Sequence, residues 1–126
     1  GLSIGDNSFI GDETMIDLAD EIKIKENVTL AERVVVLSHT NVGYKDHPLQ
    51  TFFPSISKRV VIGMGSFIGV NAVIMPGVSI AEGTFVAAGS IVTEDTKSYS
   101  LYVGTPARFI RFIKDGKDEE FSDQQS

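Results

Sequence analysis

The sequence contains no cysteine and no tryptophan, and only two of its 126 residues are histidine. The lack of cysteine excludes a disulfide framework, a thiolate metal site and a cysteine nucleophile. The longest all-aliphatic run, residues 34–37, is far too short to span a membrane. The N-terminus shows no basic region followed by an apolar stretch, so we expect no secretory signal and a cytoplasmic protein. The net charge of −6 disfavours nucleic acid as a partner.

β-Branched aliphatic residues are abundant. The chain has 13 isoleucines and 13 valines but only 6 leucines, a ratio that favours strands over helix bundles. Apolar residues make up 42% and charged residues 22%, which is typical of a globular protein. At about 150 residues per domain, the length allows one domain.

An aliphatic residue recurs at every sixth position in two blocks of the chain. The first block runs through Ile4, Ile10 and Ile16, and the second runs without a slip from Ile62 to Val92. The place after each of these residues favours glycine or a small polar residue, and the fifth place of the repeat is mostly small. A period of six matches neither a strand nor a helix alone, but it fits a short strand followed by a sharp turn.

Two registers fit the segment between the blocks. Positions 22, 28 and 34 are all aliphatic, and so are positions 24, 30 and 36. We prefer the second set, because residues 24–29 mirror residues 4–9 at an acidic residue followed by asparagine. This register requires two extra residues near Asp20 and Glu21, at one corner of the structure.

Three hexapeptides close a triangular coil of 18 residues, with inward aliphatic residues stacked in ladders. We therefore predict an all-β domain, a parallel β-helix of about four coils, over residues 1–114. Residues 40–59 break the period and predict a protruding loop, and residues 98–114 predict a C-terminal extension that forms a strand or a short helix. Residues 115–126 are acidic and polar, which predicts a disordered tail.

The second block carries a resemblance to a known family. The stretch IGMGSFIGVNAVIMPGVSIAEGTFVAAGSIVTED, followed by GTPARFIRFI, resembles the C-terminal half of galactoside, maltose and surface-polysaccharide O-acetyltransferases. These are hexapeptide-repeat acyltransferases, and the resemblance extends over roughly residues 3–113. It implies a left-handed β-helix, acetyl-CoA as co-substrate, and a homotrimer with active sites between subunits.

His39 is the first candidate for catalysis, because it stands where the repeat gives way to the loop. A lone histidine is more often structural, but the resemblance implies a catalytic histidine at this place. Neutral imidazole, with an ordinary pKa of about 6.5, suits a base that takes a proton from an attacking hydroxyl. With no cysteine for an acyl-enzyme, we expect direct transfer from acetyl-CoA.

Three further residues are candidates for acceptor binding. Asp17 stands where glycine is common in other hexapeptides, and its carboxylate would either receive sugar hydroxyls or satisfy a turn amide. Asn41 lies beside His39, and His47 lies in the loop, where it either lines the acceptor pocket or is simply exposed.

The donor site is inferred from the resemblance. It places Gly69, Ala88 and Thr93 along the pantetheine arm of CoA, and Arg108 and Arg111 at its phosphates. Arginine suits phosphate because its planar fork donates paired hydrogen bonds. Small residues also suit tight corners without any ligand. Two positions depart from the galactoside enzymes, since Val70 replaces a polar residue and Glu94 a basic one.

We therefore predict an acetyl-CoA-dependent O-acetyltransferase acting on a sugar or polysaccharide-precursor hydroxyl, with His39 as general base. The alternatives are an N-acetyltransferase of an amino sugar or amino sugar nucleotide, and a non-catalytic β-helix module. A metal-dependent carbonic anhydrase of the same fold needs three histidine ligands, and the sequence has two. We expect no metal, no nucleic acid and no membrane insertion.

Overall fold

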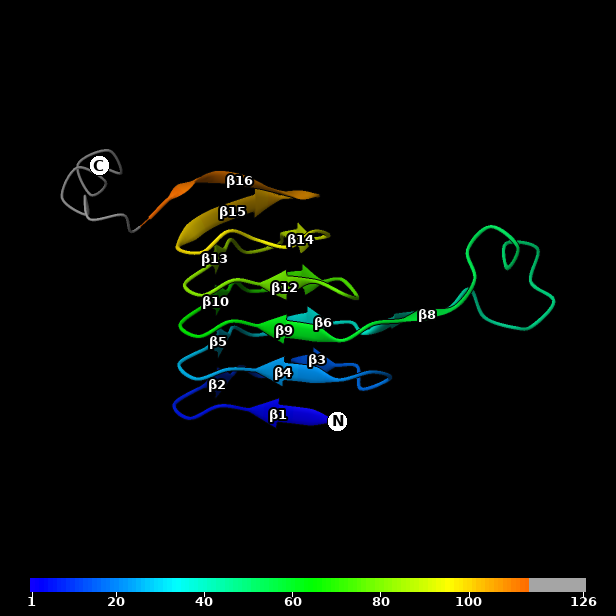
Figure 1. The fold of residues 1–126 in the computed structure, drawn as a ribbon, viewed down its shortest axis with the longest axis horizontal. Coiled ribbons are helices and arrows are strands. Elements are labelled where there is room, and N and C mark those ends of the chain that lie inside the picture. The colour runs from blue at the N-terminus through cyan, green and yellow to red at the C-terminus, as the bar shows by residue number, and fades with distance from the viewer. Residues whose placement is uncertain (114–126) are drawn as a thin grey trace.

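The chain winds into four stacked triangular coils, and a long arm projects from one corner (Figure 1). The computed structural model describes residues 1–113. Each coil contributes one short strand to each side of the triangle. The coil strands are β1 (Leu2–Ile4), β2 (Phe9–Ile10) and β3 (Met15–Ile16); β4 (Ile22–Ile24), β5 (Thr29–Leu30) and β6 (Val35–Val36); β9 (Val60–Ile62), β10 (Phe67–Ile68) and β11 (Val73–Ile74); and β12 (Ser79–Ile80), β13 (Phe85–Val86) and β14 (Ile91–Val92).

The strands stack into three sheets that run along the prism. Their orders are β1-β4-β9-β12, β2-β5-β10-β13-β15-β16 and β3-β6-β11-β14, and all pairs among the coil strands are parallel. In the first sheet Ile4 pairs with Ile24, Ile24 with Ile62, and Ile62 with Ile80. The register that the sequence favoured is therefore confirmed, and the first coil is two residues longer than the regular 18.

The core is a column of aliphatic side chains inside the prism. Both of the competing sets of positions are buried, because each side of a coil turns two residues inward, such as Ile22 and Ile24. This geometry explains why the sequence alone admitted two registers. The fifth places of the repeat are buried and small or β-branched: Ser66, Ala72, Val78, Thr84 and Ser90.

The arm begins and ends on a short antiparallel pair, β7 (His39–Thr40) and β8 (Ile56–Ser57). In this pair His39 lies opposite Ser57, and Thr40 lies opposite Ile56. Residues 41–55 extend away from the prism (Figure 1). The protruding loop predicted from the break in the repeat is present.

A hairpin closes the C-terminal end of the prism. Its strands β15 (Ser100–Gly104) and β16 (Ala107–Phe112) are antiparallel, and β15 continues the second sheet beside β13. Tyr102 and Ala107 are buried against the core. The extension predicted as a strand or a short helix is thus a strand pair. Lys114 and the predicted tail, residues 115–126, lie outside the described residues.

Residues 1–113 include no helix of the length and apolar character needed to cross a membrane.

Candidate functional site

Asp17 and His39 meet at the corner from which the arm leaves. Asp17 directly follows β3, and its amide donates to the carbonyl oxygen of Val36 in the coil above (2.9 Å). The Nδ1 atom of His39 lies 2.5 Å from Oδ2 of Asp17. The same oxygen accepts from the backbone amides of Ser38 (3.0 Å) and His39 (3.2 Å), and Oδ1 accepts from the amide of Ala19 (3.1 Å). The carboxylate therefore binds both the imidazole and the backbone that carries it.

These hydrogen bonds set the protonation of the pair. The bond from His39, followed by that from the Ser38 amide, lowers the pKa of Asp17 to about 2. An ionised carboxylate only accepts hydrogen bonds, so Nδ1 of His39 carries a hydrogen, and in the neutral form of the ring the lone pair lies on Nε2. The His39 side chain is 44% exposed while that of Asp17 is 14% exposed. The pair can therefore present an oriented base to a molecule outside the prism.

Three further residues, which are not among the candidates from the sequence, stabilise this corner by hydrogen bonds. Ser38 is fully buried, and its hydroxyl donates to the carbonyl oxygen of Asp17 (2.7 Å) and accepts from the amide of Asp20 (2.9 Å). Oδ2 of Asp20 accepts in turn from the hydroxyl of Ser57 (2.8 Å). The two extra residues predicted near Asp20 lie in this corner, and this departure from the regular coil is the sequence signal that could have indicated these residues.

The remaining acceptor candidates lie on the arm. Asn41 accepts from the amide of Gly43 (2.7 Å), which makes a local turn. Nδ1 of His47 accepts from the amide of Leu49 (3.0 Å), and its ring lies 5.3 Å from that of Tyr44. His47 belongs to residues 41–55, which extend away from the prism (Figure 1). The roles of Asp17, Asn41 and His47 in acceptor binding stay predictions.

The donor candidates occupy the C-terminal half of the prism. Gly69 and Ala88 stack on one corner, where a Cβ atom added to Gly69 would lie 2.6 Å from the Ala88 nitrogen. Thr93 is exposed and directly follows β14. This strand lies in the same sheet as β6, the coil strand that precedes His39. Arg108 is exposed on β16 opposite Val103, and Arg111 lies opposite Leu101. The structure thus brings Gly69 and Ala88 together, and their role toward CoA stays a prediction.

Comparisons with known proteins agree with this architecture. Residues 59–94 match the family model described as bacterial transferase hexapeptide (six repeats). The chain is 35% identical over 109 residues to galactoside O-acetyltransferase of Escherichia coli, covering 86% of this chain and 50% of that protein. The chain therefore spans about half the length of this relative.

Solved structures show the same coil. A hexapeptide-repeat acetyltransferase from Vibrio cholerae matches with a TM-score of 0.80 and 31% identity, over 90% of this chain and 64% of that one. The same protein complexed with acetyl coenzyme A matches with a TM-score of 0.79. A mutant N-acyltransferase from Bacillus cereus, in complex with dTDP and coenzyme A, matches with a TM-score of 0.80 and 25% identity, over 98% of this chain and 70% of that one. These matches show that the coils form a left-handed parallel β-helix.

Proposed function

Because the chain belongs to the hexapeptide-repeat transferases, we propose that it transfers an acetyl group from acetyl-CoA to a hydroxyl of a sugar or polysaccharide precursor. The observation that carries this proposal is the bond between Nδ1 of His39 and Asp17 at the foot of the arm. With Nδ1 bound to Asp17, the neutral form of this exposed side chain has its lone pair on Nε2, which is what a general base for acyl transfer needs.

The proposed reaction has two proton movements. Nε2 of His39 takes the proton of the acceptor hydroxyl as its oxygen attacks the thioester carbonyl carbon. The tetrahedral intermediate then collapses, the carbon–sulfur bond breaks, and the imidazolium returns the proton to the departing thiolate. Asp17 keeps the ring in the productive tautomer and stabilises the imidazolium that forms between the two movements.

For the donor, we propose that Gly69, Ala88 and Thr93 contact the pantetheine arm and that Arg108 and Arg111 contact the phosphates. Ala88 is exposed at this corner and Gly69 is buried next to it, and small residues let an extended chain approach the backbone closely. Arg108 is the exposed member of the arginine pair, and Thr93 stands at the corner nearer His39. These positions would lay the donor across the C-terminal half of the prism.

For the acceptor, we propose a site completed by a second subunit of a homotrimer, to which Asp17, Asn41 and His47 contribute. Tyr44, Phe52 and Phe53 on the arm are 64%, 74% and 62% exposed in the single chain. Aromatic surface of this extent is costly to leave in water. Packing of the arm against a neighbouring prism would bury it and would give the acceptor pocket a second wall.

A second candidate is N-acetylation of an amino sugar nucleotide. It is favoured by the Bacillus cereus N-acyltransferase, whose structure with dTDP and coenzyme A matches 98% of this chain. An ammonium group must also lose a proton before its nitrogen attacks, so the same base serves both reactions. The non-catalytic module is the third reading, and it predicts no consumption of acetyl-CoA.

The test is an assay of CoA release from acetyl-CoA with a panel of sugars, amino sugars and sugar nucleotides. We expect turnover with one acceptor class, and a loss of about 100-fold or more in kcat for His39→Ala, a typical general-base effect. Acetyl-CoA binding to this variant, measured by calorimetry, should stay within twofold of wild type. If the wild-type protein neither binds nor consumes acetyl-CoA, the proposal is wrong. Turnover restricted to amines would replace O-acetylation by N-acetylation.

A further inference from the structure

Two carboxylates from one corner of the first coil hold the two strands of the arm stem, one each. Asp17 binds the side chain of His39 in β7. Three residues further along the chain, Asp20 accepts from the hydroxyl of Ser57 in β8 (2.8 Å). His39 and Ser57 lie directly opposite each other in the stem. The corner therefore contacts the stem on both strands at the same level.

Hydrogen bonds to its neighbours hold Asp20 in place beside the Asp17–His39 pair. Its amide donates to Oγ of the fully buried Ser38 (2.9 Å), and its Oδ1 accepts from the amide of Glu21 (2.7 Å). Ser38 in turn donates to the carbonyl oxygen of Asp17 (2.7 Å). One continuous set of hydrogen bonds thus runs from Ser57 to the Asp17–His39 pair. The Glu21 amide and Ser57 lower the pKa of Asp20, so its carboxylate is ionised at neutral pH and accepts from both.

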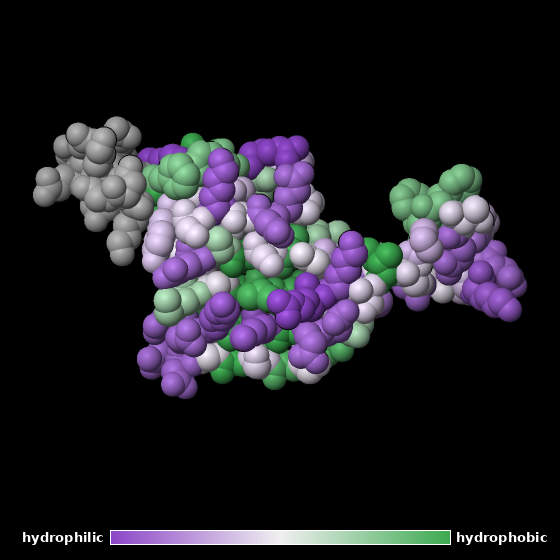
Figure 2. Space-filling model, in the orientation of Figure 1, coloured by the Kyte–Doolittle hydropathy of each residue, from purple (hydrophilic) through white to green (hydrophobic). Residues whose placement is uncertain are grey.

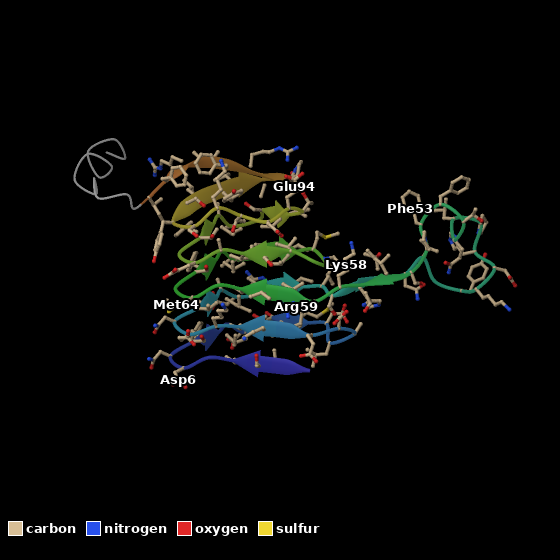
Figure 3. The ribbon with its side chains drawn as sticks, viewed as in Figure 1. Asp6, Phe53, Lys58, Arg59, Met64 and Glu94 are labelled. Carbon is tan, nitrogen blue, oxygen red and sulfur yellow. The ribbon has the colours of Figure 1, made fainter. Side chains whose placement is uncertain are left out.

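The stem needs such support, because each of its strands is two residues long. A two-stranded pair is marginally stable at best on its own. Beyond the stem, residues 41–55 extend away from the prism; Phe53 lies on this arm, and Lys58 and Arg59 lie where the chain rejoins the prism (Figure 3). The direction of the arm is therefore set by the hydrogen bonds of Asp17 to His39 and of Asp20 to Ser57 in the stem.

We propose that Asp20 is a positioning residue that, through Ser57, fixes the arm relative to His39 so that the arm presents its side chains to the acceptor. This inference rests on the proposed acetyl transfer for its kinetic consequence. Asp17 fixes the base itself, and Asp20 fixes the stem of the arm that begins at the base. Loss of the Asp20–Ser57 bond should therefore weaken acceptor binding more than it slows the chemical step.

The experiment compares Asp20→Ala, Ser57→Ala, the double variant and Asp20→Asn. The asparagine keeps both contacts, because its Oδ1 accepts from Glu21 while Ser57 accepts from its Nδ2. Asp6→Ala is the matched control, since it removes the same charge from an exposed side chain at a different corner of the same coil. Steady-state kinetics with both substrates is one readout, and hydrogen exchange of the stem amides is the other.

We expect Asp20→Ala and Ser57→Ala each to raise the acceptor KM about tenfold, which corresponds to one hydrogen bond to a charged group. The kcat and the KM for acetyl-CoA should change less than about threefold. The double variant should be no worse than either single variant, because both remove the same bond. Asp20→Asn and Asp6→Ala should resemble wild type. Hydrogen exchange of residues 39–40 and 56–58 should accelerate in the alanine variants only.

Unchanged exchange of the stem amides in both alanine variants would overturn the proposal, as would a drop in kcat at constant acceptor KM. If Asp20→Ala unfolds the protein, Ser57→Ala tests the same bond from the exposed side, where little packing is lost. If no acceptor is turned over by wild type, the proposed function fails, and hydrogen exchange still decides whether Asp20 fixes the arm.

Discussion

At the scale of single residues, the carboxylate of Asp17 fixes the orientation of the His39 ring. Both oxygens of Asp17 are engaged, Oδ2 by His39 and two amides and Oδ1 by a third amide. The carboxylate is thus a rigid acceptor and cannot rotate without breaking several bonds. The His39 ring is therefore held in one orientation, with a hydrogen on Nδ1.

The pKa of Asp17 predicts how acid affects stability. Because the folded-state pKa is about 2 and the usual value is 3.8, the ionised carboxylate stabilises the native state fully above about pH 4. This contribution is lost as the pH falls from 4 towards 2. We expect the free energy of unfolding of wild type, measured in urea, to fall more steeply over this range than that of Asp17→Asn. Parallel curves for the two proteins would contradict the assignment.

The structure pairs two residues that the sequence suggests for different roles. The sequence suggests His39 as the base, because it stands at the end of the repeat, where the resemblance implies a catalytic histidine, and that role stays a prediction. Asp17 was selected for acceptor binding, and its partnership with His39 was not foreseen. That partnership requires the register in which Ile16 pairs with Val36, so that Asp17 follows β3 directly below the strand leading to His39.

At the scale of elements, the corners of the coils decide which substitutions are tolerated. Gly69 leaves no space for a side chain, because a Cβ atom would lie 2.6 Å from the Ala88 backbone nitrogen in the next coil. Gly89 has a positive φ of 72° and open space around it. Asn71, at the same corner one coil below, adopts φ of 62°. Stacking of the coils requires glycine at position 69, whereas position 89 requires only a residue that tolerates a positive φ.

We therefore expect Gly69→Ala to lower the free energy of unfolding by about 1–3 kcal/mol, as overpacking usually does. Gly89→Asn should change it by less than about 0.5 kcal/mol, since asparagine tolerates the left-handed conformation and the site is open. Denaturant unfolding of both variants checks this pair of predictions. Equal stability of the two would show that the coils do not stack as described.

Periodicity predicted the regular elements well. The six-residue period indicated the coils, their number and the position of the two extra residues, because every coil obeys the same local rule. The stem pair β7–β8 and the hairpin β15–β16 obey no such rule. β7 pairs with β8 at the base of the arm, and β15 pairs with β16 at the end of the prism. These antiparallel pairs depend on how the folded coils place the strands, so the repeat does not predict them.

At the scale of the whole molecule, the single chain leaves much apolar surface uncovered. Figure 2 shows hydrophobic patches both on the prism and on the arm. Phe9 and Phe85 on the second sheet are 56% and 41% exposed, and Phe52 on the arm is 74% exposed. Such surface is expected to be covered in an assembly.

We expect the protein in solution to have three times the 13.6 kDa mass of one chain, as measured by light scattering. Substitution of both Phe52 and Phe53 by serine should shift the mass towards that of one chain, because it removes the exposed aromatic side chains of the arm. Thr51→Ala is the control on the same segment, and it should leave the mass unchanged. A single-chain mass for the unmodified protein would contradict the proposed trimer.

The most direct test of the central claim is a double-mutant cycle on the kcat of acetyl transfer, with wild type, His39→Ala, Asp17→Asn and the double variant. If Asp17 acts through His39, each single variant loses about 100-fold or more, and the double variant is no slower than His39→Ala alone. If the two losses instead multiply in the double variant, or if His39→Ala keeps wild-type turnover, the pair is not the catalytic base.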